Sequence, residues 1–129
     1  MEAIAIVTAL LVAQAFLFAA RVGAARVKYG IEAPATTGDP QFERAFRVHQ
    51  NTIEQLIIVL PSMWMFSYFV SVWVAAGLGV LFIVSRFIYQ AGYLADPKKR
   101  DRGFVFGAII EAVLVLGSLI GAGVSWFRA

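Results

Sequence analysis

Residues 55–85 read QLIIVLPSMWMFSYFVSVWVAAGLGVLFIVS, an uncharged stretch of 31 residues. An α-helix rises about 1.5 Å per residue, so roughly 20 residues cross the hydrocarbon core of a bilayer. Because 31 residues are too many for one comfortable crossing, we expect two helices joined by a turn near residues 70–73. The stretch therefore predicts a helical hairpin embedded in a membrane.

Two more apolar segments flank this hairpin. Residues 3–20 carry no charge, and residues 103–127 carry only Glu111. Pro and Gly residues break the helical pattern at 33–40, and the pair at 96–97 does so because a Pro disfavours helical geometry in the residue before it. We therefore expect an all-α fold, an integral membrane four-helix bundle.

The composition agrees with a single membrane domain over residues 1–129. Sixty per cent of the residues are hydrophobic, 15% are charged, and the mean hydropathy is +0.78. A soluble domain of this size has too little interior to bury so many apolar side chains. The chain has no cysteine, which excludes a disulfide-stapled module, so any thiol chemistry must use a sulfur brought in by a ligand. The four transmembrane helices are expected at about 2–28, 42–69, 73–95 and 102–127.

Basic residues collect near two of the expected loops. Ten of the eleven lie near loops 29–41 and 96–101, and only Arg128 belongs to the opposite end. Lys and Arg concentrate on the cytoplasmic side of membrane proteins. We therefore expect both loops in the cytoplasm and both termini outside, and the compact loops favour a bacterial inner membrane.

A polar stripe enters the second expected helix. Its members are spaced three, four and three residues apart, which places them on one helical face: Arg44, Arg47, Asn51 and Glu54. Charges at membrane depth usually point into a bundle or a wet cavity and mark function. The two arginines could instead only snorkel to the membrane edge, and Glu54 could form a structural salt bridge with an arginine of another helix.

The third expected helix carries a second polar set. Arg86, Tyr89 and Tyr93 are spaced three and four residues apart and share one face. Tyrosines near a membrane boundary can also be simple belt residues. A basic run follows at 98–102, and such a run usually reports topology or attraction to lipid headgroups.

Both polar sets lie at the same membrane face as Arg26 and Arg100. Arginine binds carboxylates bidentately, and Glu54 could receive an ammonium group. The residues therefore indicate a ligand that is a small zwitterion with additional carboxylates.

Two blocks of the sequence resemble a known family. Residues 36–54, TTGDPQFERAFRVHQNTIE, resemble the signature of the MAPEG superfamily, the membrane-associated proteins of eicosanoid and glutathione metabolism, in which an acidic residue and arginines precede Asn-x-x-Glu. Residues 85–93, SRFIYQAGY, followed by 96–103, DPKKRDRG, resemble the second family block, Arg-x-x-Tyr-x-x-x-Tyr and a loop arginine. The likeness is strongest to the type 3 microsomal glutathione S-transferase and leukotriene C4 synthase branch.

The resemblance implies a homotrimer whose glutathione sites lie between neighbouring subunits and open to the cytoplasmic face. It implies glutathione as co-substrate, a lipophilic small-molecule electrophile as second substrate, and membrane lipid as the surroundings. The small net charge of +3 gives no reason to expect a nucleic-acid partner. The resemblance also implies that Arg100 is the catalytic residue that stabilises the thiolate. The residues implied to hold glutathione are Arg26, Arg47, His49, Asn51, Glu54, Arg86, Tyr89 and Tyr93.

The expected activity is conjugation of glutathione to lipophilic electrophiles, a detoxification reaction, with reduction of lipid hydroperoxides as a further activity. A thiol with a pKa of about 8.5 is mostly protonated at neutral pH, and an adjacent arginine increases its thiolate fraction. One alternative is a non-catalytic lipid-binding or accessory member of the superfamily. Another is a small four-helix efflux transporter that uses Glu54 or Glu111 as its membrane-embedded acid.

Three positions depart from the leukotriene branch. Gln55 replaces a tyrosine, Val27 replaces an arginine and His49 replaces a glutamine, so synthesis of a specific leukotriene is not expected. His49 is the single histidine and could act as a general base or hydrogen-bond a ligand or the backbone. With no partner histidine or cysteine, it is not expected to bind a metal.

Four further features have structural interpretations. Glu111 could be a proton or substrate site or could hydrogen-bond another helix, and Gln14 is expected to make a similar packing contact. Gly117 and Gly121 form a GxxxG pattern that allows helices to approach closely. Trp64 could line a groove on the lipid side for the second substrate.

Overall fold

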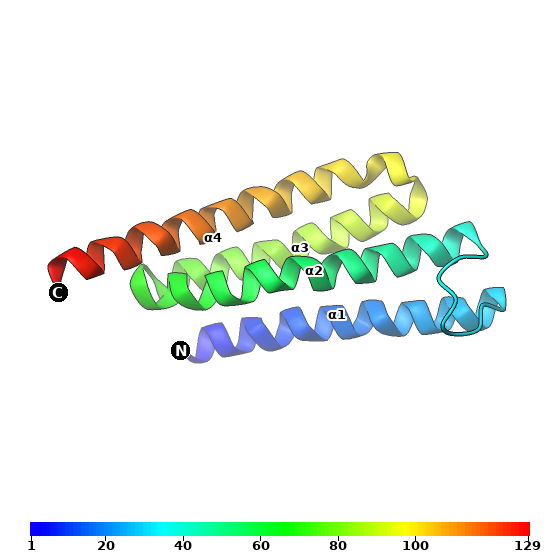
Figure 1. The fold of residues 1–129 in the computed structure, drawn as a ribbon, viewed down its shortest axis with the longest axis horizontal. Helices are drawn as coiled ribbons and strands as arrows, with labels where there is room; N and C mark the ends of the chain where they lie inside the picture. Colours follow the sequence, from blue (N-terminus) through cyan, green and yellow to red (C-terminus); the bar gives the residue numbers. More distant parts are fainter.

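The computed structural model describes residues 1–129 and shows an all-helical chain (Figure 1). Its four long helices confirm the predicted all-α, four-helix architecture, and their bounds differ from the expected ones by at most two residues. A short 3₁₀ helix, η1 (Pro97–Arg100), precedes the last of them. The long helices are α1 (Glu2–Tyr29), α2 (Pro40–Phe69), α3 (Val72–Ala95) and α4 (Asp101–Arg128).

The helices run up and down, so the two loops gather at one end of the bundle. Both termini and the α2–α3 turn lie at the other end, on the left of Figure 1. Helices α2 and α3 form the centre, because each of them packs against the other three long helices. This topology brings the end of α3, η1 and the start of α4 to the same end as the beginning of α2 (Figure 1).

Local sequence chemistry explains where the helices end. Gly30 closes α1 in the left-handed conformation, with φ of 68°, a region that glycine adopts without a steric penalty. Asp39 caps α2 through bonds from the Gln41 and Phe42 amides, and Pro40 occupies the first helical position, where no amide proton is needed. Ser71 caps α3 in the same manner by accepting from the Val74 amide.

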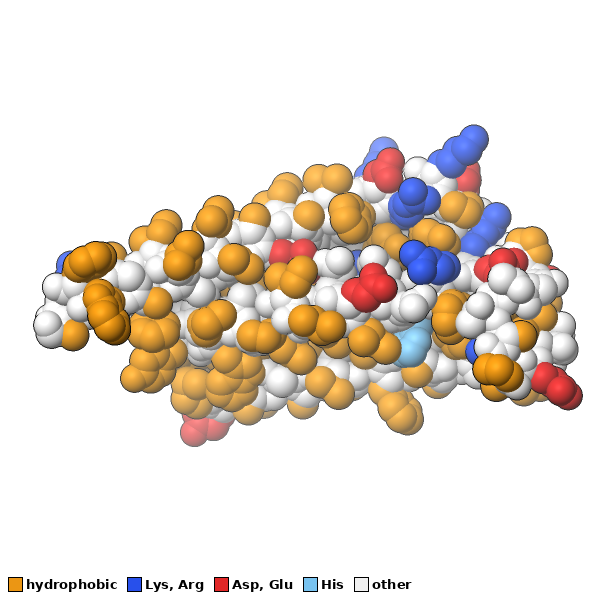
Figure 2. Space-filling view, in the orientation of Figure 1, with side chains coloured by type: hydrophobic (Ala, Val, Ile, Leu, Met, Phe, Trp, Pro, Cys, Tyr) orange, Lys and Arg blue, Asp and Glu red, His pale blue; other side chains and the backbone are white.

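The surface of the bundle suits lipid better than water. All four long helices are long and apolar enough to cross a membrane. Hydrophobic side chains cover most of the visible face, whereas Lys and Arg gather toward the end that carries the two loops (Figure 2). Phe16 and Ile57 are more than 70% exposed in the middle of their helices. Such side chains are costly in water and are normal in contact with acyl chains.

The apolar core runs along the axis between the four helices. One cluster lies toward the end that holds the termini and includes Leu11 of α1, Met63 of α2, Phe82 of α3 and Leu114 of α4. Gln14 donates to the Ile83 carbonyl oxygen at 2.8 Å, the packing contact between helices that we expected.

Glycines bring α4 close to its neighbours. A Cβ on Gly117 or Gly121 would collide with Phe66 or with Val70, so the GxxxG pattern packs α4 against α2 within one protomer. Gly103, in the first turn of α4, lies directly against the backbone of Tyr89 in α3. This contact sets the distance between α3 and the segment that carries the loop arginines.

Substituting Gly103 with alanine should destabilise the protein, because the new Cβ would lie 2.5 Å from the Tyr89 Cα and the two backbones must separate. Overpacking of this kind typically costs about 1–3 kcal/mol. Thermal unfolding in detergent should show a clearly lower Tm for Gly103→Ala. Gly77→Ala in α3 is the matched control, since nothing lies within 4 Å of its Cβ position. Equal Tm values for the two variants would contradict this packing.

Candidate functional site

The polar stripe of α2 lies on the outer surface of the protomer. Arg47 and Glu54 are exposed and Asn51 is half-buried, so all three remain on one helical face as predicted. Glu54 lies about 21 Å from the start of a helix that is about 45 Å long, at 1.5 Å per residue. The carboxylate is therefore exposed near the middle of α2, directly before the uncharged residues 55–69.

The polar set of α3 points into the protein. Tyr89 is 4% exposed, and its ring lies 5.7 Å from that of the half-buried Tyr93. Arg86, one turn earlier, is 1% exposed and is the largest of the fully buried side chains. Its guanidinium carbon lies 4.1 Å from the centre of the Tyr89 ring, within the range of a cation–π interaction.

Arg86 connects α3 to α2. It donates to the Asn51 Oδ1 at 2.8 Å and to the Thr52 Oγ1 at 3.0 and 3.3 Å. Thr52 is fully buried and donates its own hydroxyl proton to the Val48 carbonyl oxygen. Because the Asn51 carbonyl accepts from Arg86, the amide NH₂ of Asn51 remains available to a ligand.

One cavity collects five of the predicted site residues. Its volume is about 450 Å³, within the range of small-molecule sites. It lies among α2, α3, η1 and the first turn of α4, at the end of the bundle that carries the loops. The lining residues are Arg47, Asn51, Tyr89, Tyr93, Arg100, Asp101 and Phe104.

The charge in this cavity is mostly positive. The guanidinium of Arg100 lies 5.9 Å from the centre of the Tyr93 ring and donates to the Pro97 carbonyl oxygen at 3.2 Å. Arg47 donates only to the amide oxygen of Gln50. Neither arginine forms a salt bridge, since the single ion pair of the chain joins the N-terminal amine to Glu2. Two guanidinium groups that form no salt bridge, next to two phenols and one carboxylate, leave a net positive charge that suits an anion.

Four predicted site residues do not line the cavity. Arg86 lies buried behind it, and Glu54 lies on the stripe beyond Asn51. Arg26 donates to the Ala35 carbonyl oxygen at 2.7 Å and lies over the Phe42 ring. His49 follows Arg47 by two residues, which places it about 200° around the helix, on the opposite face.

Sequence reasoning missed three residues of this region. Thr52 carries no signal of its own, because its importance depends on the position of Arg86 across the interface between two helices. Asp101 and Phe104 had a usable signal, since they follow Arg100 by one and four residues at the start of a helix.

Two other polar residues of the sequence analysis have structural partners. The amide of Gln55 donates to the Glu111 Oε2 at 2.8 Å in the orientation that satisfies both groups, so Glu111 bonds another helix as one of our alternatives predicted. Arg44 donates to the Leu94 carbonyl oxygen at 3.1 Å, near the end of α3. No group of three or more His, Cys, Asp or Glu side chains is arranged to hold a metal ion.

Comparisons with known proteins identify the family of the chain. The model of the MAPEG family matches residues 4–120. Microsomal glutathione S-transferase 2 of Homo sapiens is 39% identical over 118 residues, which cover 92% of this chain and 80% of the relative. Leukotriene C4 synthase of Mus musculus is 31% identical over 107 residues, which cover 80% and 71%. An uncharacterized protein of Synechocystis sp. is 40% identical over 116 residues, which cover 90% and 85%.

Two of these relatives carry names of the branch that the two sequence blocks indicated, with a type 2 transferase where the motifs had indicated type 3. The family model covers most of the residues that form the four helices, including every residue of the cavity. The chain belongs to the MAPEG family of membrane-bound proteins.

Proposed function

We propose that this protein is a membrane-bound glutathione transferase that binds glutathione in the cavity lined by Arg47, Tyr93 and Arg100. The observation that carries the proposal is the pair of arginines, neither of them in a salt bridge, that share one cavity with Asn51 and Tyr89. Glutathione has two carboxylates, an ammonium group and a thiol, so it is the class of ligand that this charge distribution suits. The names of the human and mouse relatives support the same assignment.

The reaction that we propose begins with loss of the thiol proton. Arg100 is the cation that stabilises the resulting thiolate, because an adjacent guanidinium favours the charged form of the sulfur. The thiolate attacks an electrophilic carbon of a lipophilic substrate, a carbon–sulfur bond forms, and the leaving group departs with its electron pair. Because the cavity would hold the sulfur in a fixed position for attack, positioning supplies a large part of the acceleration.

A lipid hydroperoxide is the other class of acceptor. Attack of the thiolate on the peroxide oxygen breaks the oxygen–oxygen bond and gives an alcohol and a glutathione sulfenic acid. A second glutathione then reduces the sulfenic acid, which yields the disulfide and water. The same stabilised thiolate serves both reactions.

We further propose that the functional unit is a homotrimer with the sites between neighbouring protomers. A charged side chain that faces lipid at mid-helix costs roughly 2.5–3.5 kcal/mol on insertion scales, and Glu54 is exposed on the isolated protomer. A second copy that covers the α2 stripe removes this cost. It also supplies the missing ligands, because Arg26 and His49 lie outside the cavity of their own protomer. The two loops at this end are then cytoplasmic, in line with their basic residues.

Replacing Arg100 with alanine should abolish the thiolate absorbance band that glutathione produces on binding to the purified protein. Loss of one such group typically lowers turnover about 100-fold or more. Stopped-flow absorbance and conjugation of a chloronitrobenzene acceptor measure the two effects, and glutathione affinity should change less. Arg102→Ala, from the same basic run but outside the cavity, is the matched control and should keep both signals. Full turnover in Arg100→Ala would refute the role of Arg100.

Replacing Glu54 with alanine should weaken glutathione binding, because the ammonium group loses its carboxylate partner. A hydrogen bond to a charged group contributes about 1.5–3 kcal/mol, so the Kd should rise roughly 10- to 100-fold. Titration calorimetry in detergent measures this constant. Glu32→Ala, an exposed carboxylate of the first loop, should leave it unchanged. If the two variants bind equally well, Glu54 has a structural role only.

Mixed trimers test whether each site uses two protomers. Arg26→Ala and Arg100→Ala protomers should each form poorly active homotrimers. When they are co-expressed and co-purified with different tags, about a quarter of the sites in a random mixture should combine both intact arginines if these come from neighbouring subunits of a cyclic trimer. Activity of the mixture therefore rises above that of either parent. No gain on mixing would place both arginines in the same protomer's site and contradict the shared arrangement.

A further inference from the structure

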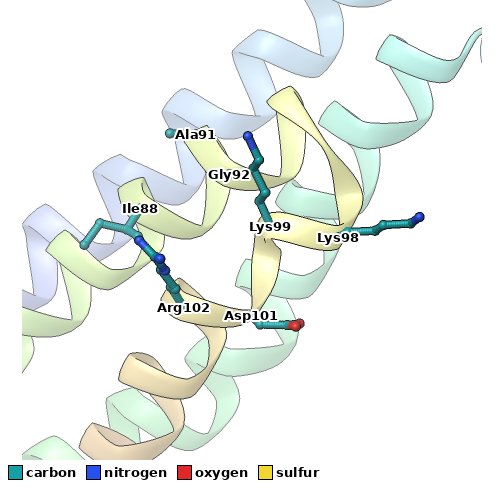
Figure 3. Close-up of a pocket in the computed structure, with 7 residues that line it drawn as sticks. All are labelled: Ile88, Ala91, Gly92, Lys98, Lys99, Asp101 and Arg102. Atoms are coloured by element: carbon teal, nitrogen blue, oxygen red, sulfur yellow. The ribbon is translucent and has the colours of Figure 1, made fainter.

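A second, larger cavity lies beside the α3–α4 connection. Its volume is about 690 Å³, and it shares only Asp101 with the cavity of the proposed glutathione site. Figure 3 shows Arg102 extending toward Ile88 and Lys99 rising past Gly92, so two cations border an apolar strip of α3. The lining residues are Ile88, Ala91, Gly92, Lys98, Lys99, Asp101 and Arg102.

Two basic side chains of this cavity have no polar partner within the protein. Lys99 and Arg102 are exposed, and neither forms a side-chain hydrogen bond or a salt bridge. Asp101, the carboxylate between them in sequence, pairs with neither. Three basic side chains with one carboxylate leave a local excess of positive charge, which suits an anion.

The charged cavity continues into an apolar groove. A third cavity of about 440 Å³ begins at Asp101 and Arg102 and runs along the outer side of α4. Val105 and Ile109 lie one helical turn apart in it and are 54% and 58% exposed. Arg102 therefore stands at the junction of a basic pocket and an apolar groove.

This combination identifies one class of ligand. A soluble anion would use the basic pocket alone and gain nothing from the groove. A phospholipid has a phosphate followed by acyl chains, in the same order as the pocket and the groove. The loop end of the bundle, where the basic side chains gather, is the level at which lipid headgroups lie.

We propose that this surface is a binding site for an anionic phospholipid, with the phosphate at Lys99 and Arg102 and an acyl chain along Val105 and Ile109. The site is separate from the glutathione cavity, so the proposal does not depend on the transferase activity. Its position on η1 and the first turns of α4 means that a bound lipid contacts the segment that also carries Arg100.

Competition between lipids tests the headgroup half of the site. Intact protein in nanodiscs of equimolar phosphatidylglycerol and phosphatidylcholine is released in a native mass spectrometer, and the retained lipids are counted. Each basic residue near a membrane surface changes binding by roughly fivefold, so Lys99→Gln and Arg102→Gln should each lower retained phosphatidylglycerol by about that factor. Lys28→Gln, a basic residue at the same end but outside the cavity, should retain the wild-type amount. Equal loss in all three variants, or none, would overturn the site.

The apolar half needs its own measurement. Ile109→Ala removes part of the groove and should lower phosphatidylglycerol retention, because the acyl chain loses van der Waals contacts with this side chain. Excess soluble glycerol phosphate should not displace the lipid. Displacement by glycerol phosphate would show an anion site without a lipid. An unchanged Tm in detergent for each variant shows that the protein is folded.

Discussion

Arg86 places a permanent positive charge inside the bundle, and protein groups alone must solvate it. A buried charge without partners costs several kcal/mol, which makes its contacts with α2 a strict requirement of the fold. Asn51 and Thr52 supply the two oxygens, and Tyr89 supplies a ring face. Each contact also constrains its partner, so one guanidinium sets the register of α2 against α3. It thereby holds Asn51 and Tyr89 where the cavity forms.

The contacts of Arg86 leave one polar surface of the chain, the stripe on α2, without a covering protein partner. Arg86 bonds Asn51, and the exposed stripe continues past Asn51 to Glu54 in the middle of α2. Burial within the protomer is not available to this carboxylate, because Val48 and Val59 occupy the inner face of the same helix. Only another polypeptide or a ligand can cover the stripe. The proposed assembly and the proposed ligand would therefore use the same surface, which gives a reason for the charged face of this helix.

The sequence predicts those features that depend on local rules. Apolar length and the Asp–Pro pairs locate the helices, and the 3.6-residue period assigns Arg47 and Asn51 to one face. Tertiary packing decides which of the polar side chains are buried and which partners they bond. Arg86 and Arg47 have the same chemistry in the sequence, yet one is buried and the other is exposed, because Gly103 brings α4 against Tyr89 and closes the space around α3. Arg26 bonds its own loop, which no periodicity indicates. The family resemblance identifies these residues as site residues, but it does not tell which protomer of the proposed trimer supplies each one.

The short basic run at 98–102 contributes side chains to two different cavities. Residues advance by about 100–120° in helices of the α and 3₁₀ type, so Arg100 and Arg102 point to nearly opposite sides of the same short segment. One arginine enters the cavity beside Tyr93, and the other stands between the basic pocket and the apolar groove. Pro97 and the Asp96 cap hold the start of this segment at the end of α3. A phosphate bound at Arg102 and an anion bound at Arg100 would therefore contact opposite sides of one short segment.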